Sequence, residues 1–600
     1  MNEAEFGVRL TPNGAAFRLW APAAKRVDVV LDHSVAMQRD EDGWFFAEVR
    51  GARAGTLYKY RIDDSTDVSD PASYFQPSDI AGPSEILDHG AYKWRATGWH
   101  GRPWNEAVIM EAHVGTFTKE GTYRAMIGKL DHLAETGFTA LELMPLADFP
   151  GRRNWGYDGV LWYAPDSSYG HPDDLKALID EAHLRGLMVL LDAVYNHFGP
   201  EGNYLGRYAP QFFSGTQTPW GGAIDYRVPQ VRQFAIGSAI HWLREYRFDG
   251  LRLDAVHEIV ENGNIPLLHD LSIAAGELAK STGREIHLVL ENDDNRASIL
   301  DPNTDPAAGK YRAQWNDDYH HAWHVLLTGE NGSYYRDYPR PRESIARALG
   351  SGFIYQGETS VHRGGRPRGE PSKNLPPTAF INFLQNHDQI GNRAMGDRLA
   401  ASVDPAAIEA ALAITLLAPM PPMMFMGEEW GSTTPFPFFC DFTGELADAV
   451  RQGRRREFET AHNAFGGDVP DPLDASTFEL AKLDWTESTS TRGRERLALV
   501  RHLLSIRRTD IVPVLAQAAF DHAGVQSNGY LTATWKLGDG TLLLQANLSS
   551  KAIASHSPAT ANNRLIFGEA GDDLKPWGVV WAVEAAPPAS SSNRQNKKEI

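Results

Sequence analysis

The first hundred residues alternate between apolar and polar positions with a period of two. Four short segments show this alternation, at residues 16–20, 26–31, 43–49 and 57–62. Turn signals separate them, at residues 13–14, 42–43 and 63–64. Because side chains alternate across a strand, each segment presents one apolar face. The pattern predicts a small β-sandwich domain over residues 1–100, in which an irregular linker around Pro71 and Pro83 follows the strands.

From about residue 105 the periodicity changes to apolar runs that alternate with helical segments. Eight runs are strand candidates, at residues 107–113, 138–144, 187–192, 248–257, 286–291, 313–315, 379–384 and 423–426. Helical periodicity lies between them, at residues 122–137, 173–185, 231–246 and 266–280, and a closing helix is expected at 495–508. Eight strands with intervening helices predict a catalytic (β/α)8 TIM barrel over residues 101–510.

Strand periodicity returns in the last part of the chain. Residues 530–535 and 541–547 are apolar segments joined by a turn at residues 539–540. They predict a C-terminal β-domain over residues 511–586, and the polar residues 587–600 predict a disordered tail. The fold class expected from the whole pattern is therefore α/β, a TIM barrel between an N-terminal β-sandwich and a C-terminal β-domain.

Composition limits which binding partners and which cellular compartment we expect. The chain carries 77 acidic and 58 basic residues, a formal net charge of −19, which disfavours nucleic acid and anionic membranes as partners. No apolar run is long enough to span a bilayer, and no signal-peptide pattern is visible at the N-terminus. The single cysteine, Cys440, excludes an internal disulfide and suits a reducing compartment. We therefore expect a cytoplasmic protein.

Ionisable side chains gather at the predicted carboxyl ends of the barrel strands, which is where barrel enzymes place their sites. They are His113, Asp192, His197, Arg252, Asp254, His257, Glu291, His387 and Asp388. Each alone could be a surface or ion-pair residue. Together they are hard to explain by packing, because carboxylates are seldom buried without a partner or a function. We expect these side chains to form one substrate site.

Glycoside cleavage uses two carboxyl groups of opposite protonation state. Arg252 lies on the same strand face as Asp254 and would keep that carboxylate ionised, as a nucleophile requires. Glu291 follows the apolar residues 288–290, which would raise its pKa and keep it protonated as an acid. A structural ion pair at the end of residues 248–257 is the alternative reading of Arg252 and Asp254.

Four segments resemble the signature regions of the α-amylase superfamily, glycoside hydrolase family 13. They are residues 192–197, 250–255, 291 and 386–388, in the order and strand positions of that family. The resemblance implies a retaining mechanism on α-glucosidic bonds, with Asp254 as nucleophile, Glu291 as acid/base and Asp388 as transition-state stabiliser. It also implies that the sugar at the cleavage point is lined by matching family positions, namely Tyr157, His197, Arg252 and His387.

Further segments resemble one subfamily more closely. The N-terminal sandwich is similar to the carbohydrate-binding-module-like domains of branching and debranching enzymes. Residues 111–117, 315–321, 386–393 and 425–430 resemble hydrolases that cut the α-1,4 bond next to the trehalose end of maltooligosyltrehalose. That resemblance implies substrate contacts from Asp317, Asp318, His321, Gln389, Asn392 and Arg393. It also implies a maltooligosyltrehalose-forming synthase as pathway partner.

Two other functions are weighed against this one. A branching or debranching enzyme would use the same site with a different acceptor. A carbohydrate-binding scaffold with a decayed barrel would lack a catalytic carboxylate, whereas Asp254, Glu291 and Asp388 are all present. The N-terminal Trp20, Trp44 and Tyr58 could be core or a glucan platform, and the inward positions of a sandwich favour core.

No metal or other cofactor is expected. Calcium in α-amylases lies under a long segment after the third strand, and Asn196 matches that pattern. Here residues 198–229 are short and offer only Glu201 and Asp225 as carboxylates, whereas calcium needs six to eight oxygen ligands.

Overall fold

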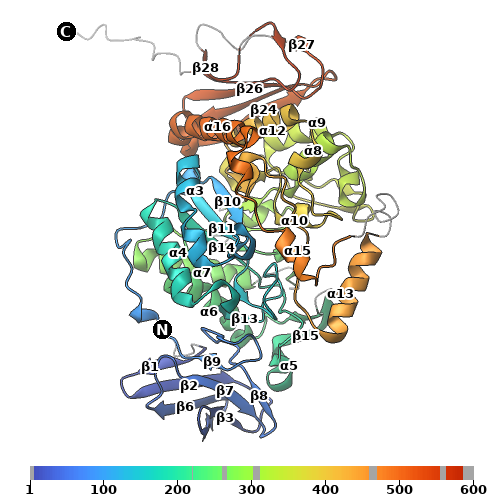
Figure 1. The fold of residues 1–600 in the computed structure, drawn as a ribbon. Coiled ribbons are helices and arrows are strands. Elements are labelled where there is room, and N and C mark those ends of the chain that lie inside the picture. The colour runs from blue at the N-terminus through green and yellow to red at the C-terminus, as the bar shows by residue number, and fades with distance from the viewer. Residues whose placement is uncertain are drawn as a thin grey trace, which may run out of the picture.

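Eight parallel strands close into a barrel at the centre of the molecule (Figure 1). The computed structural model describes residues 6–218, 221–259, 266–301, 311–458, 469–554, 563–569 and 571–584, so the tail expected at 587–600 lies outside it. The barrel strands, in order around the barrel, are β10 (Ile109–Ala112), β11 (Ala140–Leu143), β14 (Met188–Ala193), β17 (Gly250–Leu253), β18 (His287–Leu290), β19 (Tyr311–Trp315), β22 (Phe380–Phe383) and β23 (Pro422–Phe425). The predicted TIM barrel is confirmed.

Apolar side chains from most of the barrel strands fill the barrel interior. Val289, Phe383 and Met423 belong to one buried cluster inside it. Gly250 is needed in β17 because a Cβ there would lie 2.2 Å from the carbonyl oxygen of His287 on the neighbouring strand. Large side chains at other positions keep the barrel a packed core, so the only room for a ligand is at its ends.

Helices surround the barrel and follow the predicted order. The longer ones are α4 (Pro172–Leu184), α6 (Pro229–Glu245), α7 (Pro266–Thr282), α8 (Asp317–Thr328), α9 (Pro341–Ser351), α12 (Pro405–Leu417) and α16 (Thr491–Ile506). The helix expected at 122–137 is instead two, α2 (Tyr123–Ile127) and α3 (Leu130–Thr136). The break falls at Gly128, which has low helix propensity and serves as the C-cap of α2. No helix within the described ranges is long and apolar enough to cross a membrane.

The N-terminal sandwich lies below the barrel in Figure 1 and consists of two antiparallel sheets. One sheet holds β1 (Arg9–Thr11), β2 (Gly14–Trp20), β6 (Trp44–Arg50) and β5 (Gln38–Arg39). The other holds β4 (Ser34–Ala36), β3 (Val27–Val30), β7 (Leu57–Ile62) and β8 (Thr66–Val68), and β9 (Ser84–Glu85) also pairs with β7. Phe17 of the first sheet contacts Tyr58 of the second, with ring centroids 5.1 Å apart. Trp20, Trp44 and Tyr58 are all buried, so they are core residues as expected.

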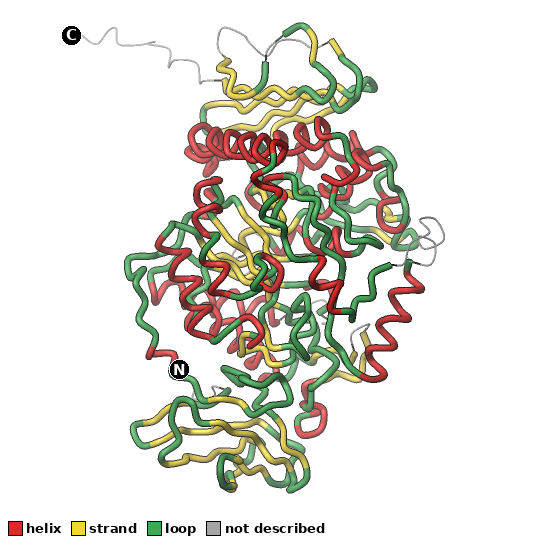
Figure 2. Tube along the Cα trace, viewed as in Figure 1, coloured by secondary structure: helices red, strands yellow, loops and turns green. Residues whose placement is uncertain are grey.

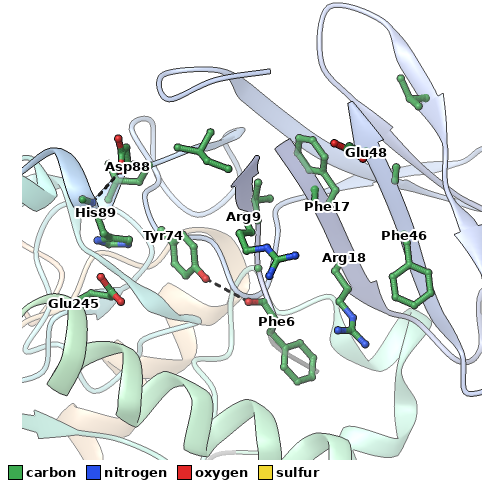
Figure 3. A pocket seen from close by; sticks show the side chains of 18 of the residues that line it. Phe6, Arg9, Phe17, Arg18, Phe46, Glu48, Tyr74, Asp88, His89 and Glu245 are labelled. Carbon is green, nitrogen blue, oxygen red and sulfur yellow. Dashed lines mark hydrogen bonds between the residues drawn. The ribbon is translucent and has the colours of Figure 1, made fainter. Parts of the chain in front are cut away.

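A groove of about 1100 Å³ separates this sandwich from the side of the barrel (Figure 3). Arg9, Arg18 and Glu48 line it from the sandwich sheet, and His89 and Glu245 line it from the opposite wall. Glu245 is the last residue of α6, which leads into the amino end of β17. The groove therefore lies away from the carboxyl ends of the barrel strands.

The C-terminal sheet packs on the helical layer at the other end of the molecule (Figure 2). Its strands, in order, are β24 (Ala518–Val525), β25 (Tyr530–Leu537), β26 (Gly540–Asn547), β30 (Val579–Glu584) and β28 (Asn563–Phe567). Trp535 and Trp581 stack at 5.6 Å between centroids. Their indole N–H groups donate to carbonyls of α9 and α12, at 2.9 Å and 3.1 Å. Two buried tryptophans thus attach this sheet to the barrel.

Candidate active site

The carboxyl ends of the barrel strands surround a cavity of about 700 Å³. Ten of the residues proposed from the sequence line it, namely Tyr157, His197, Arg252, Asp254, His257, Glu291, Asp317, His387, Asp388 and Asn392. These side chains come from loops that are far apart in the sequence and meet because the strands converge. The barrel therefore assembles most of the expected residues around one space.

Arg252 is the electrostatic centre of this cavity. Its Nη1 donates to both oxygens of Asp192, at 2.8 Å and 2.9 Å, and to Oδ1 of Asp254 at 2.6 Å. The guanidinium lies 4.1 Å from the ring centroid of Trp315, which fixes its plane. Its Nη2 is 3.3 Å from Oε2 of Glu291. One buried cation therefore faces three carboxyl groups.

The surroundings shift the pKa values of Asp254 and Glu291 in opposite directions. Burial alone would raise the pKa of Asp254, but the charge of Arg252 and a 2.8 Å hydrogen bond from Asn196 outweigh it, so the pKa of Asp254 is lowered. Burial raises the pKa of Glu291, and the nearby charge of Asp254 adds to this against the opposing effect of Arg252. The two pKa values are thus shifted in opposite directions, which is the direction that a nucleophile and an acid require.

A sharp turn after β17 joins the two carboxyl groups. The strand expected over residues 248–257 is shorter, because β17 ends at Leu253 and a 3-10 turn occupies Val256–Glu258. Between them Ala255 adopts a left-handed conformation, with φ 39° and ψ 50°. Its N–H donates to Oε2 of Glu291 at 2.7 Å. Residues 254–257 therefore lie beyond the strand that was expected to reach His257, and Arg252 is its last polar residue.

His387 and Tyr157 form a second side of the cavity. Their rings stack with centroids 5.0 Å apart, and the Tyr157 hydroxyl donates to Asp192 at 2.6 Å. Asp388 is exposed to the cavity and accepts a 2.8 Å hydrogen bond from Asn392. The Nε2 of His197 is 3.0 Å from the carbonyl of Tyr157. The polar groups at this side are thus fixed before any ligand binds.

Several residues expected to contact substrate lie behind the cavity wall instead. His113 is buried against the carbonyl of Asn154, at 2.9 Å, and burial lowers its pKa to about 4. Asp192 is occupied by Arg252 and Tyr157, and burial raises its pKa to about 7. Asp192 thus supports two cavity-lining side chains, and neither His113 nor Asp192 lines the space itself.

The polar residues at the start of α8 also differ in whether their side chains line the cavity or are buried behind it. Asp317 lines the cavity, whereas Asp318 is fully buried and accepts hydrogen bonds from Asn295 and Tyr338, at 2.8 Å and 2.5 Å. His321 is also buried, beside the hydroxyl of Tyr338 at 3.1 Å. Successive helical residues point about 100° apart, so one carboxylate faces the cavity and the next faces the protein.

Gln389 and Arg393 also lie outside the cavity lining. The Gln389 side-chain amide donates to Asp317 at 3.4 Å, and Arg393 forms ion pairs with Glu330 and Asp397, at 2.7 Å and 2.9 Å. These contacts place Gln389 behind a cavity carboxylate and Arg393 at the base of the loop that carries Asn392.

Other residues at the site were missed by the sequence reasoning. Asn196, which lies in the signature segment 192–197 but was given no catalytic role, donates to both the carbonyl and the carboxylate of Asp254. Glu111 lies in a segment noted only for its resemblance, and it binds His387. The helix α13 (Gly444–Glu457) adds Arg454 and Glu457 to the cavity lining. Its sequence has no feature that distinguishes it from an exposed helix.

The segment after the third barrel strand offers few metal ligands. Glu201 accepts a hydrogen bond from Thr443 at 3.3 Å, and Asp225 pairs with Arg227 at 2.7 Å. Among the described residues, no group of three or more histidine, cysteine or acidic side chains is arranged to hold a metal ion.

Comparison with known proteins places this geometry in a family. Residues 105–212 match the model of the α-amylase catalytic domain, and residues 5–75 match carbohydrate-binding module 48, the isoamylase N-terminal domain. The malto-oligosyltrehalose trehalohydrolase of Deinococcus radiodurans is 38% identical over 95% of this chain and 94% of its own length. That of Mycobacterium tuberculosis is 40% identical over 96% of this chain and 100% of its own length.

The chain belongs to the malto-oligosyltrehalose trehalohydrolase family. The predicted resemblance to the α-amylase superfamily is thereby confirmed. A candidate α-amylase from Salmonella typhimurium, known from a crystal structure, is 43% identical in sequence to this trehalohydrolase-family chain. The match covers 97% of this chain and 99% of the Salmonella chain, and the two structures superpose with a TM-score of 0.91. A pullulanase from Paenibacillus barengoltzii, at 20% identity and a TM-score of 0.72, shares the fold.

Proposed function

We propose that this trehalohydrolase-family chain hydrolyses the α-1,4 bond next to the terminal trehalose of maltooligosyltrehalose, releasing trehalose and a maltooligosaccharide. The observation that carries the proposal is the placement of Asp254 and Glu291 on the guanidinium of Arg252, with the pKa of Asp254 lowered and the pKa of Glu291 raised. A retaining glycosidase requires one ionised and one protonated carboxyl group, on either side of the scissile bond.

In the proposed mechanism Asp254 attacks the anomeric carbon while Glu291 protonates the glycosidic oxygen. The Oδ1 of Asp254 is bound by Arg252 and its Oδ2 by Asn196, so both groups orient the attacking carboxylate. Release of the trehalose end leaves a glycosyl ester on Asp254, and the deprotonated Glu291 then activates water to cleave it. Asp388, at the cavity surface, would bind sugar hydroxyls and stabilise the distorted ring.

Recognition of trehalose is assigned to polar groups beyond the cleaved bond. Asp317, Asn392 and His257 line the cavity and present groups that can bind hydroxyls. Asp318, His321, Gln389 and Arg393 would act behind them by fixing α8 and the loop after β22. A site built on hydroxyl contacts discriminates strongly, because an analogue that lacks those hydroxyls leaves the polar groups of the site unpaired.

The test gives the enzyme maltooligosyltrehalose and the maltooligosaccharide of equal length at equal concentration. Trehalose and new reducing ends are followed separately. The trehalose-capped substrate should be cleaved far faster. Comparable rates, or transfer products longer than either substrate, would refute the proposal and indicate an amylase or a branching enzyme. A synthase that forms maltooligosyltrehalose would supply the substrate, and a reducing cytoplasm suits the single buried thiol of Cys440.

A further inference from the structure

Glu111 is a buried carboxylate that the proposed mechanism does not use. It lies on β10, is 1% exposed, and points toward the start of α10 (His387–Gly391). Its Oε1 is 2.5 Å from Nδ1 of His387, and its Oε2 accepts the backbone N–H of the same residue at 3.1 Å. The carboxylate thus holds both the ring and the main chain of His387.

The imidazole of His387 is fixed in orientation by its neighbours. It stacks on Tyr157 and meets the edge of Trp155, with ring centroids 5.3 Å apart. The residue lines the cavity beside Asp388. Within the described part of the chain, its Nε2 makes no hydrogen bond to protein. With Nδ1 turned to Glu111, Nε2 is the nitrogen available to a ligand.

The charge of the ring decides what Nε2 can do. A neutral imidazole that donates from Nδ1 has only an acceptor at Nε2, whereas an imidazolium donates from both nitrogens. Burial would lower the pKa of His387, but the carboxylate of Glu111, and then Asp388, raise it above the ordinary value. The titratable or charged groups that face the ring are Glu111, His113, Tyr157, Asp192, Arg252 and Asp388.

A second buried carboxyl group on the next strand differs from Glu111 in its partners. Glu142 pairs with Glu111 in the register of β10 and β11, and neither of its oxygens has a hydrogen-bond partner among the residues that the structure describes. Burial, with the charges of Asp192 and Glu111, raises the pKa of Glu142 well above its ordinary value. Glu142 is therefore a matched control, a buried Glu in the same layer whose side chain forms no hydrogen bond to His387 or to any other residue in the described ranges.

We propose that Glu111 is a positioning residue that keeps His387 doubly protonated, so that its Nε2–H is donated to a hydroxyl of the sugar bound beside Asp254 and Asp388. The inference rests on the proposed function only in placing a sugar in this cavity. It does not depend on trehalose. Glu111 itself touches no substrate and acts through the orientation and charge of His387.

The test is the pH profile of kcat/KM for hydrolysis of α-maltosyl fluoride, followed by fluoride release. Fluoride leaves without protonation, so the ionisation of Glu291 does not limit the first step. The charged form of His387 is lost as the pH rises through the pKa of this residue. Glu111→Gln lowers that pKa, so the alkaline limb of the variant's kcat/KM profile should move to lower pH. At mildly alkaline pH the variant should lose about ten-fold or more in kcat/KM, the usual effect of losing a charged hydrogen bond.

Three comparisons make the result specific. Glu142→Gln should leave the alkaline limb where it is in the wild type. In a His387→Asn background, Glu111→Gln should produce no further shift. An unshifted limb in Glu111→Gln, or an equal shift in Glu142→Gln, would overturn the proposal.

A spectroscopic measurement covers the case in which Glu111→Gln does not fold. In wild-type protein labelled with 15N-histidine, the His387 signals are assigned by their loss in His387→Asn. Both ring nitrogens should be protonated at neutral pH, and a neutral ring would refute the proposal. If the wild type released no trehalose from maltooligosyltrehalose, the proposed function would fall, while these two measurements would still decide the role of Glu111.

Discussion

Replacing Arg252 by methionine should damage catalysis through the ionisation of Asp254. The guanidinium side chain is 3% exposed and contacts Asp192, Asp254 and Glu291, at 2.8 Å, 2.6 Å and 3.3 Å. Removing a preorganised donor from an active site costs about 2.7–4 kcal/mol of transition-state stabilisation, which corresponds to a loss of roughly 100- to 1,000-fold in kcat/KM. Asp192, whose pKa burial already raises to about 7, would take up a proton and limit the loss of stability.

The pH dependence of kcat/KM on maltooligosyltrehalose separates this effect from general damage. Arg252 lowers the pKa of Asp254, so the nucleophile is ionised down to low pH in the wild type. In Arg252→Met that pKa rises, and the acid limb of the profile should move to higher pH. Arg252→Lys keeps the positive charge but loses the forked guanidinium that reaches three carboxyl groups. The kcat/KM of this variant should therefore fall, with a smaller shift of the acid limb than in Arg252→Met. A folded Arg252→Met protein with the acid limb of the wild type would refute the reasoning.

Three further outcomes are expected. Asp254→Ala should abolish turnover on every substrate, whereas Glu291→Gln should cripple maltooligosyltrehalose cleavage and largely spare an α-glycosyl fluoride; equal losses on both would show that Glu291 is not the acid. Proton NMR of the first-formed product should show the α-anomer of the released sugar, and a β-anomer would contradict retention. Trp44→Ala should destabilise the N-terminal sandwich by about 3–5 kcal/mol, measured by urea unfolding, without a change in glucan binding, because this side chain is 4% exposed in the core.

The barrel and its main carboxyl groups were predictable because they depend on periodicity. Buried parallel strands can be recognised in a sequence as continuous apolar runs. Their carboxyl ends meet at one face of the barrel regardless of the loop conformations. Asp254, Glu291 and Asp388 follow three such runs, so their convergence required no detail of the backbone. The retaining geometry itself stays a prediction for the NMR experiment.

What could not be predicted depends on local geometry and on elements outside the barrel. The left-handed turn at Ala255 has no sequence signal, because alanine rarely adopts that conformation. Which of Asp317 and Asp318 faces the cavity depends on the residue at which α8 begins. Periodicity does not fix the first residue of a helix to within one or two positions. Arg454 reaches the cavity from α13, a polar helix after the last barrel strand, where no pattern links it to the site.

The left-handed turn also bears on how this protein could be stabilised. An alanine at φ 39° costs about 1 kcal/mol or more relative to glycine in the same conformation. That cost is tolerated because the Ala255 N–H is the hydrogen-bond link between the strand that carries Asp254 and the carboxyl group of Glu291. A search for more stable variants would therefore favour glycine at this position. The relaxed backbone would have more freedom in the spacing of the two carboxyl groups, so selection for thermal stability alone would act against activity here.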